Sequence, residues 1–388
     1  MMLFEVSRLR RVYVLQSLRL IKVYAQFINS LYICTMLSEL KNEHQLPEYI
    51  VVGQGISGTF LSYYLHKVGK KFIVYDEAKP FTASKVASGV INPVTGRRIV
   101  KTWMIDDVMP FTVNAYQTLE KELNVSLIQQ ANILDFHPTT QMQLAFDERL
   151  PQETDYLKKV EQAEQWQQYF NYPFGIGETN PCWLIDINTL LIEWRKKLLK
   201  ENVLIESKFE VEQPQTPNFK PKTILFCDGV AGFENPYFNL LPYSRMKGEA
   251  LIVHIPNLPR TNMFKHGLNL VPWKNDLWWV GSSYDWKFEN TEPTENFRKK
   301  TIAQLQAFLK IPFTIVDHIA SERPANMERR PFVGLHPIHK NIGILNGMGT
   351  KGCSLAPYFA HELVEHLVHG KAINPLADVQ RFKNILSR

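Results

Sequence analysis

Three glycines in the stretch VVGQGISGTF have a spacing that can hold a phosphate group. Gly53, Gly55 and Gly58 follow a run of β-branched residues and open a segment with helical periodicity. In this pattern the first glycine allows a tight turn, the second lets the backbone approach a pyrophosphate, and the third lets the helix pack closely on the strand. The first helical N–H groups, those of Ile56 and Ser57, would then face the phosphates. We predict a dinucleotide site here.

An acidic residue stands where such a site needs one. Asp76 closes the next apolar run, 18 residues after Gly58. A carboxylate at this position can accept hydrogen bonds from both hydroxyls of an adenosine ribose. Glu77 takes that role if the register is shifted by one residue. A chance glycine pattern in a turn is the alternative, but strand, helix, second strand and acid together favour the dinucleotide interpretation.

A second glycine loop lies near the C-terminus. Gly347, Gly349 and Gly352 follow an apolar run and precede a long amphipathic segment. A simple NAD enzyme has no need of such a loop, whereas in a flavoenzyme the loop and helix N-terminus can face the pyrimidine edge of the flavin, where negative charge collects on reduction. Thr350 and Lys351 belong to this loop. Lys351 either adds to that positive field or is an ordinary surface lysine.

Periodicity predicts the elements that position these loops. The first unit is strand 49–52, helix 57–68 and strand 71–75. The middle of the chain has an alternating, aromatic texture typical of antiparallel strands. The other predicted elements are helices 186–200, 295–309 and 355–368, and strands 203–205, 223–226, 249–255, 277–281 and 341–345. We therefore expect an α/β fold: a Rossmann-like domain with an inserted antiparallel sheet.

Composition narrows the class of protein. The chain has 388 residues, 45% of them hydrophobic, which suffices for two domains. Its four cysteines form no CxxC pair and its histidines no metal-ligand spacing, so we expect no disulfide framework and no metal site. No apolar run is long enough for a transmembrane helix. These features favour a cytoplasmic protein.

Residues 1–45 differ from the rest. Residues 1–35 carry five basic residues and one acidic residue, which leaves only +2 of the net charge of +6 for the remainder. A targeting peptide, a surface amphipathic helix and a start codon placed too far upstream are the three explanations. We favour the last, with translation from Met36, and expect residues 1–35 to be dispensable. The nearly neutral remainder weighs against nucleic-acid binding.

From about residue 48 to its end, the chain resembles the D-amino-acid-oxidase-like family of FAD-dependent oxidoreductases, which includes glycine oxidase and sarcosine oxidase. Besides the two glycine loops, three segments carry the resemblance: ASKVASGVINP, TILFCDGVAG and SERPANMERRPFVG. The first implies that Ser84, Ser88 and Gly89 lie near FAD, and the second implies the same for Gly229. In the third, Arg323 matches the arginine that binds the substrate carboxylate in the family.

The resemblance implies a domain division and a reaction. Segments 46–105, 181–240 and 321–388 would form the FAD-binding domain, and 106–180 and 241–320 the substrate-binding domain. The expected reaction oxidises the C–N bond of an amine or amino acid by hydride transfer to noncovalent FAD, with O2 or another acceptor reoxidising the flavin. Arg323 would hold a glycine-like carboxylate, since a guanidinium gives a bidentate grip; a structural salt bridge is the alternative.

A narrower resemblance is to the flavin domain of the bifunctional enzymes that modify the aminomethyl group of tRNA wobble uridine. It is carried by MGTKGCSLAPYFAHEL and ASKVASGVINP. A flavin oxidase acting on tRNA is therefore the second functional hypothesis, and a non-catalytic dinucleotide-binding protein is the third. Three departures from the family pattern are Asp76, where glutamate is usual, Asp228, where a small residue is usual, and Arg330, where an apolar residue is often found.

Overall fold

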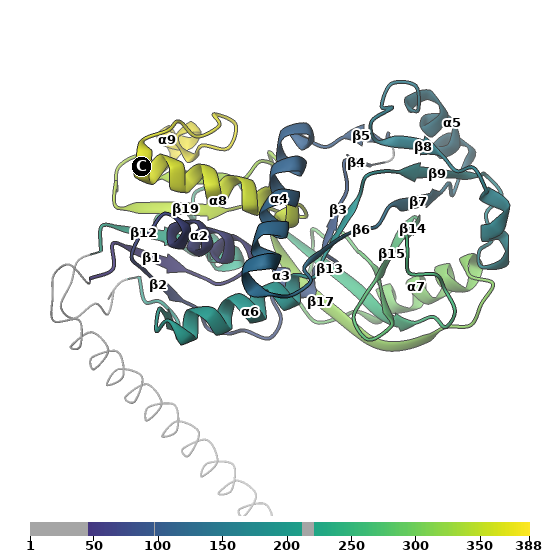
Figure 1. The fold of residues 1–388 in the computed structure, drawn as a ribbon, viewed down its shortest axis with the longest axis horizontal. Helices are drawn as coiled ribbons and strands as arrows, with labels where there is room; N and C mark the ends of the chain where they lie inside the picture. Colours follow the sequence, from purple (N-terminus) through teal and green to yellow (C-terminus); the bar gives the residue numbers. More distant parts are fainter. Residues whose placement is uncertain (1–45, 97, 212–220) are drawn as a thin grey trace, which may run out of the picture.

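The computed structural model describes residues 46–96, 98–211 and 221–388. Two lobes lie side by side, each built around one sheet (Figure 1). The predicted N-terminal extension, residues 1–45, lies outside the described residues.

The first lobe contains a mostly parallel sheet of six strands. The predicted β–α–β unit at its centre is confirmed, and only the edge strand β18 runs antiparallel to its neighbour. In spatial order the strands are β11 (Leu204–Ile205), β2 (Phe72–Tyr75), β1 (Tyr49–Val52), β12 (Thr223–Phe226), β19 (Ile342–Asn346) and β18 (Phe332–Leu335). This is the predicted Rossmann-like sheet.

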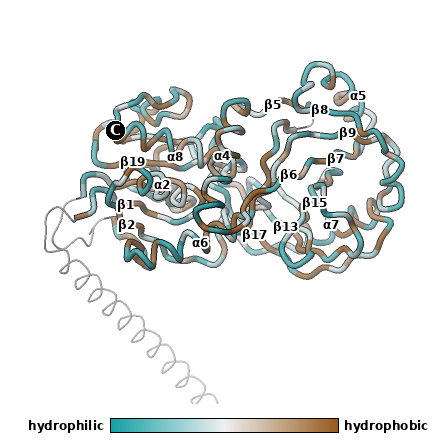
Figure 2. The backbone as a smooth tube through the Cα atoms, in the orientation of Figure 1, coloured by the Kyte–Doolittle hydropathy of each residue, from teal (hydrophilic) through white to brown (hydrophobic). Residues whose placement is uncertain are grey.

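Alternation along β1 explains how both faces of this sheet are covered. Tyr49 and Val51 face a layer of helices, whereas Ile50 faces the C-terminal segment. The helical layer consists of α2 (Ile56–Lys67), α4 (Ile105–Leu123), α6 (Ile187–Lys200) and α8 (Gly352–His369). The opposite face is covered by a 3-10 helix (Val379–Phe382) and α9 (Lys383–Leu386). In Figure 2, hydrophobic segments run through these central strands, and the outer loops are mostly hydrophilic.

The second lobe is built on an eight-stranded mixed sheet, antiparallel except where β14 pairs with β7. In spatial order its strands are β17 (Thr314–Asn326), β13 (Tyr243–His254), β16 (Leu277–Gly281), β15 (Leu268–Pro272), β14 (Met263–His266), β7 (Ile133–Phe136), β9 (Ile176–Thr179) and β8 (Leu157–Lys159). Helix α7 (Glu295–Phe308) packs on one face, and its Leu305 and Phe308 join that core. The predicted antiparallel insertion is thus present.

Small elements join the lobes. The remaining strands are β3 (Val90–Ile91), β10 (Trp183–Ile185) and β6 (Ile128–Gln130) in one sheet, and β4 (Val94–Thr95) and β5 (Val100–Lys101) in another. The remaining helical segments are α3 (Ala83–Val86), α5 (Thr140–Arg149) and two 3-10 helices, Ala163–Gln168 and Gly229–Phe233.

Two elements are longer than their sequence pattern predicts. Strand β13 begins at Tyr243 instead of residue 249, because it pairs with β17 along its whole length although charged residues interrupt the apolar pattern. Helix α8 begins at Gly352 instead of residue 355, so the helix follows the glycine loop directly. Gly370 ends α8 in the left-handed conformation (φ 69°), as its C-cap position predicts.

The predicted domain boundaries stay a prediction, but two elements lie across them. Strand β17 continues through the boundary between residues 320 and 321. Helix α4, which falls in the segment assigned to the substrate-binding domain, packs on α8 of the first lobe. There the hydroxyl of Thr112 donates to the Ser354 carbonyl (2.8 Å) and that of Tyr116 to the Cys353 carbonyl (3.0 Å).

Candidate functional site

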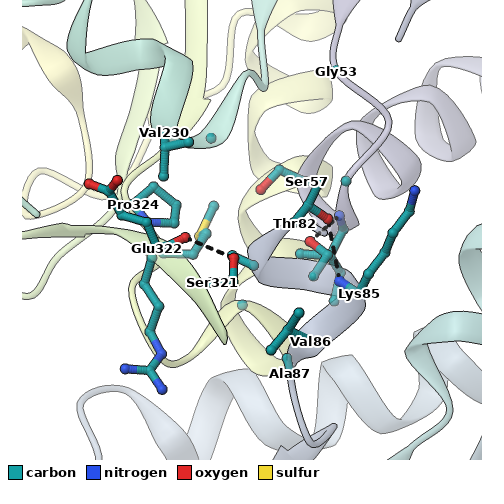
Figure 3. Close-up of a pocket in the computed structure, with 18 of the residues that line it drawn as sticks. Gly53, Ser57, Thr82, Lys85, Val86, Ala87, Val230, Ser321, Glu322 and Pro324 are labelled. Carbon is teal, nitrogen blue, oxygen red and sulfur yellow. Dashed lines mark hydrogen bonds between the residues drawn. The ribbon is translucent and has the colours of Figure 1, made fainter. Parts of the chain in front are cut away.

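A cavity of about 900 Å³ lies where the two lobes meet. In Figure 3, Gly53, Ser57 and Thr82 lie on one wall of the cavity, and Val230, Ser321 and Pro324 lie on the opposite wall. The loops after β1, β2, β12 and β19 all open into it. In a parallel sheet this edge, outside the carboxyl ends of the strands, is where ligands bind.

The loop after β1 has the close packing that its glycines predict. Gly53 has φ +98°, and a Cβ there would lie 2.6 Å from the Cys227 carbonyl oxygen. A Cβ on Gly58 would lie 1.8 Å from the Gly53 carbonyl oxygen, so α2 presses directly on the turn. The Ile56 N–H donates to the Ser84 hydroxyl (3.1 Å). This contact joins the first glycine loop to the ASKVASGVINP segment.

Asp76 stands at the end of β2 with its carboxylate fixed by three donors. The backbone N–H of Gln54 donates to Oδ2 (2.8 Å), and Oδ1 accepts from the Ala78 N–H (2.8 Å) and from Nη1 of Arg195 (2.8 Å). Arg195 is itself held by Glu206 at 2.7 Å. Because a carboxylate has about four lone-pair sites, Asp76 retains acceptor capacity toward the cavity. Arg195 lies in no recognisable sequence motif, and its contact with Asp76 was not predicted from the sequence.

The C-terminal glycine loop brings a half-buried cation to the cavity. Lys351 occupies the N-cap position of α8 without a side-chain capping hydrogen bond, and no described residue forms an ion pair with its ammonium group. Burial and the neighbouring Arg330 and Arg329 lower the pKa of Lys351. The Gly349 N–H donates to the Pro324 carbonyl (3.1 Å), which holds the loop beside β17. An uncompensated cation of this kind favours an anionic ligand or ligand edge.

A half-buried acid joins two of the cavity loops. Asp228, after β12, accepts from the amide of Asn346 (2.9 Å) and from that of Asn235 (3.1 Å). The same Asn346 amide donates to the Gly229 carbonyl (2.9 Å). Since no cation pairs with it among the described residues, burial raises the pKa of Asp228 to about 6. The departure from the family pattern at this residue thus fastens the second glycine loop to the loop after β12.

Arg323 projects from β17 onto the cavity wall. Its Nη2 donates to the Ser282 hydroxyl (2.8 Å) and its Nη1 to the Ser283 carbonyl (3.2 Å), and the guanidinium lies over the ring of Tyr284, 5.3 Å from the ring centroid. No aspartate or glutamate of the described chain forms an ion pair with it, and burial lowers the pKa of Arg323. Its remaining N–H groups are therefore available to a ligand in the cavity.

Most of the predicted site residues meet at this cavity. Those that line it are Gly53, Gly55, Ile56, Ser57, Asp76, Glu77, Ser84, Ser88, Gly229, Arg323, Gly349, Thr350, Lys351 and Gly352. Gly58, Gly89 and Gly347 stand behind the wall. A Cβ on Gly89, which has φ +84°, would lie 2.0 Å from the Ile185 carbonyl oxygen, so this glycine is needed for backbone packing.

Several lining residues lie outside every motif. Arg195, Gly248, Asn269 and Ser282 reach the cavity from separate elements. Of the aromatic residues of the middle segment, Trp278 is buried in the core, whereas Trp279 and Tyr284 line the cavity. Only alternation along the strands could have indicated which of these residues share a face.

Comparison with known protein families identifies the chain. Residues 48–366 match the family model described as DAO, FAD dependent oxidoreductase. The chain belongs to this FAD-dependent oxidoreductase family. The match covers both lobes and all the loops that open into the cavity, which agrees with the resemblance noted from the sequence.

Solved structures share the fold of this oxidoreductase at low sequence identity. Glycine oxidase from Bacillus cereus ATCC 14579 has a TM-score of 0.72 and 13% identity, with 88% of this chain and 99% of that chain covered. Iminodiacetate oxidase from Chelativorans sp. BNC1 has a TM-score of 0.67 and 16% identity, with 84% of this chain and 97% of that chain covered. L-alpha-glycerophosphate oxidase from Mycoplasma pneumoniae, with FAD bound, has a TM-score of 0.64 and 15% identity, with 85% of this chain and 97% of that chain covered. These likenesses establish the fold and leave the substrate open.

The residues of the cavity fit the FAD on which the family depends. The N-terminus of α2 has no side-chain cap and can offer the Ser57 N–H to a pyrophosphate, whereas the Ile56 N–H, which was also expected to face the phosphates, donates to Ser84. Close approach is possible because Gly55 has no side chain. Asp76 suits the ribose, and the loop with Lys351 suits the electron-rich edge of a flavin. Across the described ranges we find neither a cluster of potential metal ligands nor a helix long and apolar enough to cross a membrane.

Proposed function

We propose that this oxidoreductase oxidises the C–N bond of a carboxylated amine, such as glycine or an N-substituted glycine. The observation that carries the proposal is the guanidinium of Arg323, which lies on the cavity wall without a carboxylate partner. An unpaired, half-buried guanidinium favours an anion, and the planar carboxylate fits its fork.

The residues of the chain would bind and orient the substrate. Arg323 would hold the carboxylate, and Ser282 and Ser283 would keep the guanidinium in place. Trp279 would limit the space beside the carbon that reacts. When bound, FAD supplies a two-electron acceptor for the hydride of the carbon next to the amine, and O2 or another acceptor removes the electrons afterwards. No catalytic base is needed for an amine that binds in its neutral form.

We propose further that FAD is held noncovalently. Two cysteines, Cys227 and Cys353, line the cavity, but burial raises the pKa of both thiols, to about 12 for Cys353. A protonated thiol is a poor nucleophile. The purified protein should be yellow, and acid precipitation should leave the flavin in the supernatant; flavin that stays in the pellet contradicts noncovalent binding.

Arg323 supplies the test of the reaction. Amines are first screened for bleaching of the flavin without oxygen. For an amine that bleaches it, Arg323→Ala should lower kcat/KM by roughly tenfold to a hundredfold, because a charge-assisted contact is lost. Arg323→Lys should recover only part. Wild-type turnover by the alanine variant would move the carboxylate site elsewhere, and loss of flavin would make Arg323 a cofactor or structural residue.

A second candidate is a tRNA whose wobble uridine carries a carboxymethylaminomethyl group, as the narrower resemblance suggests. It would present the same carboxylated amine to Arg323. In its favour, Arg329, Arg330 and Lys351 interact electrostatically and form no ion pairs with described residues, so they could meet phosphates. Oxidation of the modified tRNA, with no oxidation of free N-substituted glycines, would select this candidate. Membership in an oxidoreductase family weighs against a non-catalytic protein.

A further inference from the structure

Asn269 presents an unused hydrogen-bond acceptor to the cavity. It lies on β15 opposite Gly281 of β16, and its Nδ2 donates to the Gly281 carbonyl (3.3 Å). That contact identifies which end of the amide is the nitrogen, because a carbonyl accepts and does not donate. No described residue donates to Oδ1 of Asn269, and the residue is half-buried in the cavity wall.

Asn269 and Arg323 are anchored to the same short segment of chain. Asn269 binds the Gly281 carbonyl, while Arg323 binds the Ser282 hydroxyl and the Ser283 carbonyl. Gly281, Ser282 and Ser283 are consecutive residues, so their Cα atoms lie within about 8 Å of one another. The acceptor of Asn269 and the fork of Arg323 are therefore both held by one segment of three residues in the cavity wall.

Residues with a small side chain or none lie on the face of the sheet between them. Gly248, Ala250, Gly281 and Ser321 lie on this face of the sheet, as the register places them in line with Asn269 and Arg323. A Cβ on Gly281 would lie 2.9 Å from Trp279 and 3.0 Å from the Ala250 Cβ. Trp279 therefore packs over Gly281, and the guanidinium of Arg323 lies over Gly248, so both groups border this part of the cavity wall.

We propose that Asn269 is a substrate-binding residue whose amide oxygen accepts an N–H of the substrate amine, while Arg323 holds the carboxylate. This inference rests on the proposed function and adds the second contact that fixes the direction of the substrate. A neutral acceptor binds the amine without the strong electrostatic stabilisation of the protonated form that a carboxylate would give. The carbon between the two contacts would then be the one that reacts.

The test compares ligands that do and do not carry the amine. Sarcosine serves as substrate, and acetate, which has only the carboxylate, serves as competitive inhibitor of the FAD-loaded enzyme. For Asn269→Ala we expect a fall of roughly threefold to tenfold in kcat/KM for sarcosine, the effect of one neutral hydrogen bond, and an inhibition constant for acetate within about twofold of wild type. For Arg323→Ala, kcat/KM for sarcosine should fall and acetate should bind more weakly.

Asn269→Asp separates binding from a structural role. The aspartate keeps the acceptor and loses the donor to Gly281. If Asn269 binds the amine, this variant should retain kcat/KM for sarcosine within about threefold at its optimum, and its pH profile should shift toward alkaline pH because a carboxylate favours the unreactive ammonium form. If Asn269 only supports Gly281, the aspartate variant should lose as much kcat/KM for sarcosine as the alanine variant does. Acetate binding should then weaken in both variants.

Each outcome decides one question. Unchanged kcat/KM in Asn269→Ala, or equal weakening of sarcosine and acetate in both Asn269 variants, overturns the role of Asn269 and leaves the proposed function in place. If the wild-type enzyme binds acetate but oxidises neither sarcosine nor any other carboxylated amine, the proposed function fails and this inference fails with it. Flavin content, measured in every variant, reports folding.

Discussion

The guanidinium of Arg323 occupies the space above Gly248. An ideal Cβ built on Gly248 would lie 1.9 Å from Nη2 of Arg323 and 2.1 Å from its Cζ. The two residues belong to the paired strands β13 and β17. The missing side chain at residue 248 is therefore what allows Arg323 to lie against the sheet and reach Ser282 and Ser283.

Gly248→Ala should displace this guanidinium while the sheet stays folded. The atoms that the new methyl group meets are the end of a flexible side chain, which can move at lower cost than backbone. We expect acetate to bind at least roughly tenfold more weakly, as in Arg323→Ala, because the charge-assisted contact is lost. Retained flavin with weaker acetate inhibition is the result that supports this relationship.

Gly267→Ala is the matched control for a general loss of stability. Gly267 joins β14 and β15 with φ +73°, and no atom lies within 4 Å of its built Cβ. The alanine should cost about 1 kcal/mol of backbone strain and lower the melting temperature without changing acetate binding. Equal acetate binding in wild type and Gly248→Ala would show that Arg323 does not need the space.

Arg195 should support FAD binding through Asp76. Asp76→Ala removes the proposed ribose acceptor, so the apoprotein should bind FAD roughly tenfold to a hundredfold more weakly in a fluorescence titration. Arg195→Ala should have a smaller effect, because it only frees the carboxylate to move. Glu206→Ala, which removes the outer partner of Arg195, is the control and should change little. Wild-type affinity in Asp76→Ala would remove Asp76 from the site.

Lys351 should tune the flavin. If its ammonium lies near the electron-rich edge, Lys351→Met should lower the two-electron reduction potential by about 30 mV, the equivalent of about 1.4 kcal/mol. Lys340→Met changes an exposed lysine outside the cavity lining and should leave the potential unaltered. A dye-equilibration titration measures both. The same potential in both variants would make Lys351 an ordinary lysine.

Asp228 should make stability depend on pH between about 4 and 6. Because burial raises its pKa in the folded state from 3.8 to about 6, the folded protein binds this proton more tightly than the unfolded chain does. The resulting stabilisation is full below pH 4 and is lost as the pH rises through 6, a change of about 3 kcal/mol. The unfolding free energy of Asp228→Asn, whatever its absolute value, should lack this decrease. Parallel pH curves for the two proteins would contradict it.

The sequence by itself determined the first β–α–β unit and its chemistry. Gly53, Gly55, Gly58 and Asp76 lie within a short stretch, and the periodicity of that stretch places them at one strand edge. The second glycine loop could be predicted for the same reason, and with it the FAD-binding fold. Such features depend on local conformation, which neighbouring residues largely decide.

Strand and helix limits were less predictable where pairing outweighs local pattern. The first six residues of β13, from Tyr243, include charged residues, and only their register with β17 makes them a strand. Gly248 lies in this part. Its role was invisible in the sequence, since its backbone angle is ordinary for a strand and the reason for a glycine is the side chain of Arg323.

Only the tertiary structure decided how the charged and polar groups of the cavity are paired. Arg195 reaches Asp76 across 119 residues, and Asn346 reaches Asp228 across 118. Asn269 and Arg323 bind neighbouring residues of one segment, 281–283, because β15, β16, β13 and β17 are neighbours in one sheet. Residue spacing carries no information about such contacts, because they arise from the order in which strands pack, and that order follows from burial of the whole core.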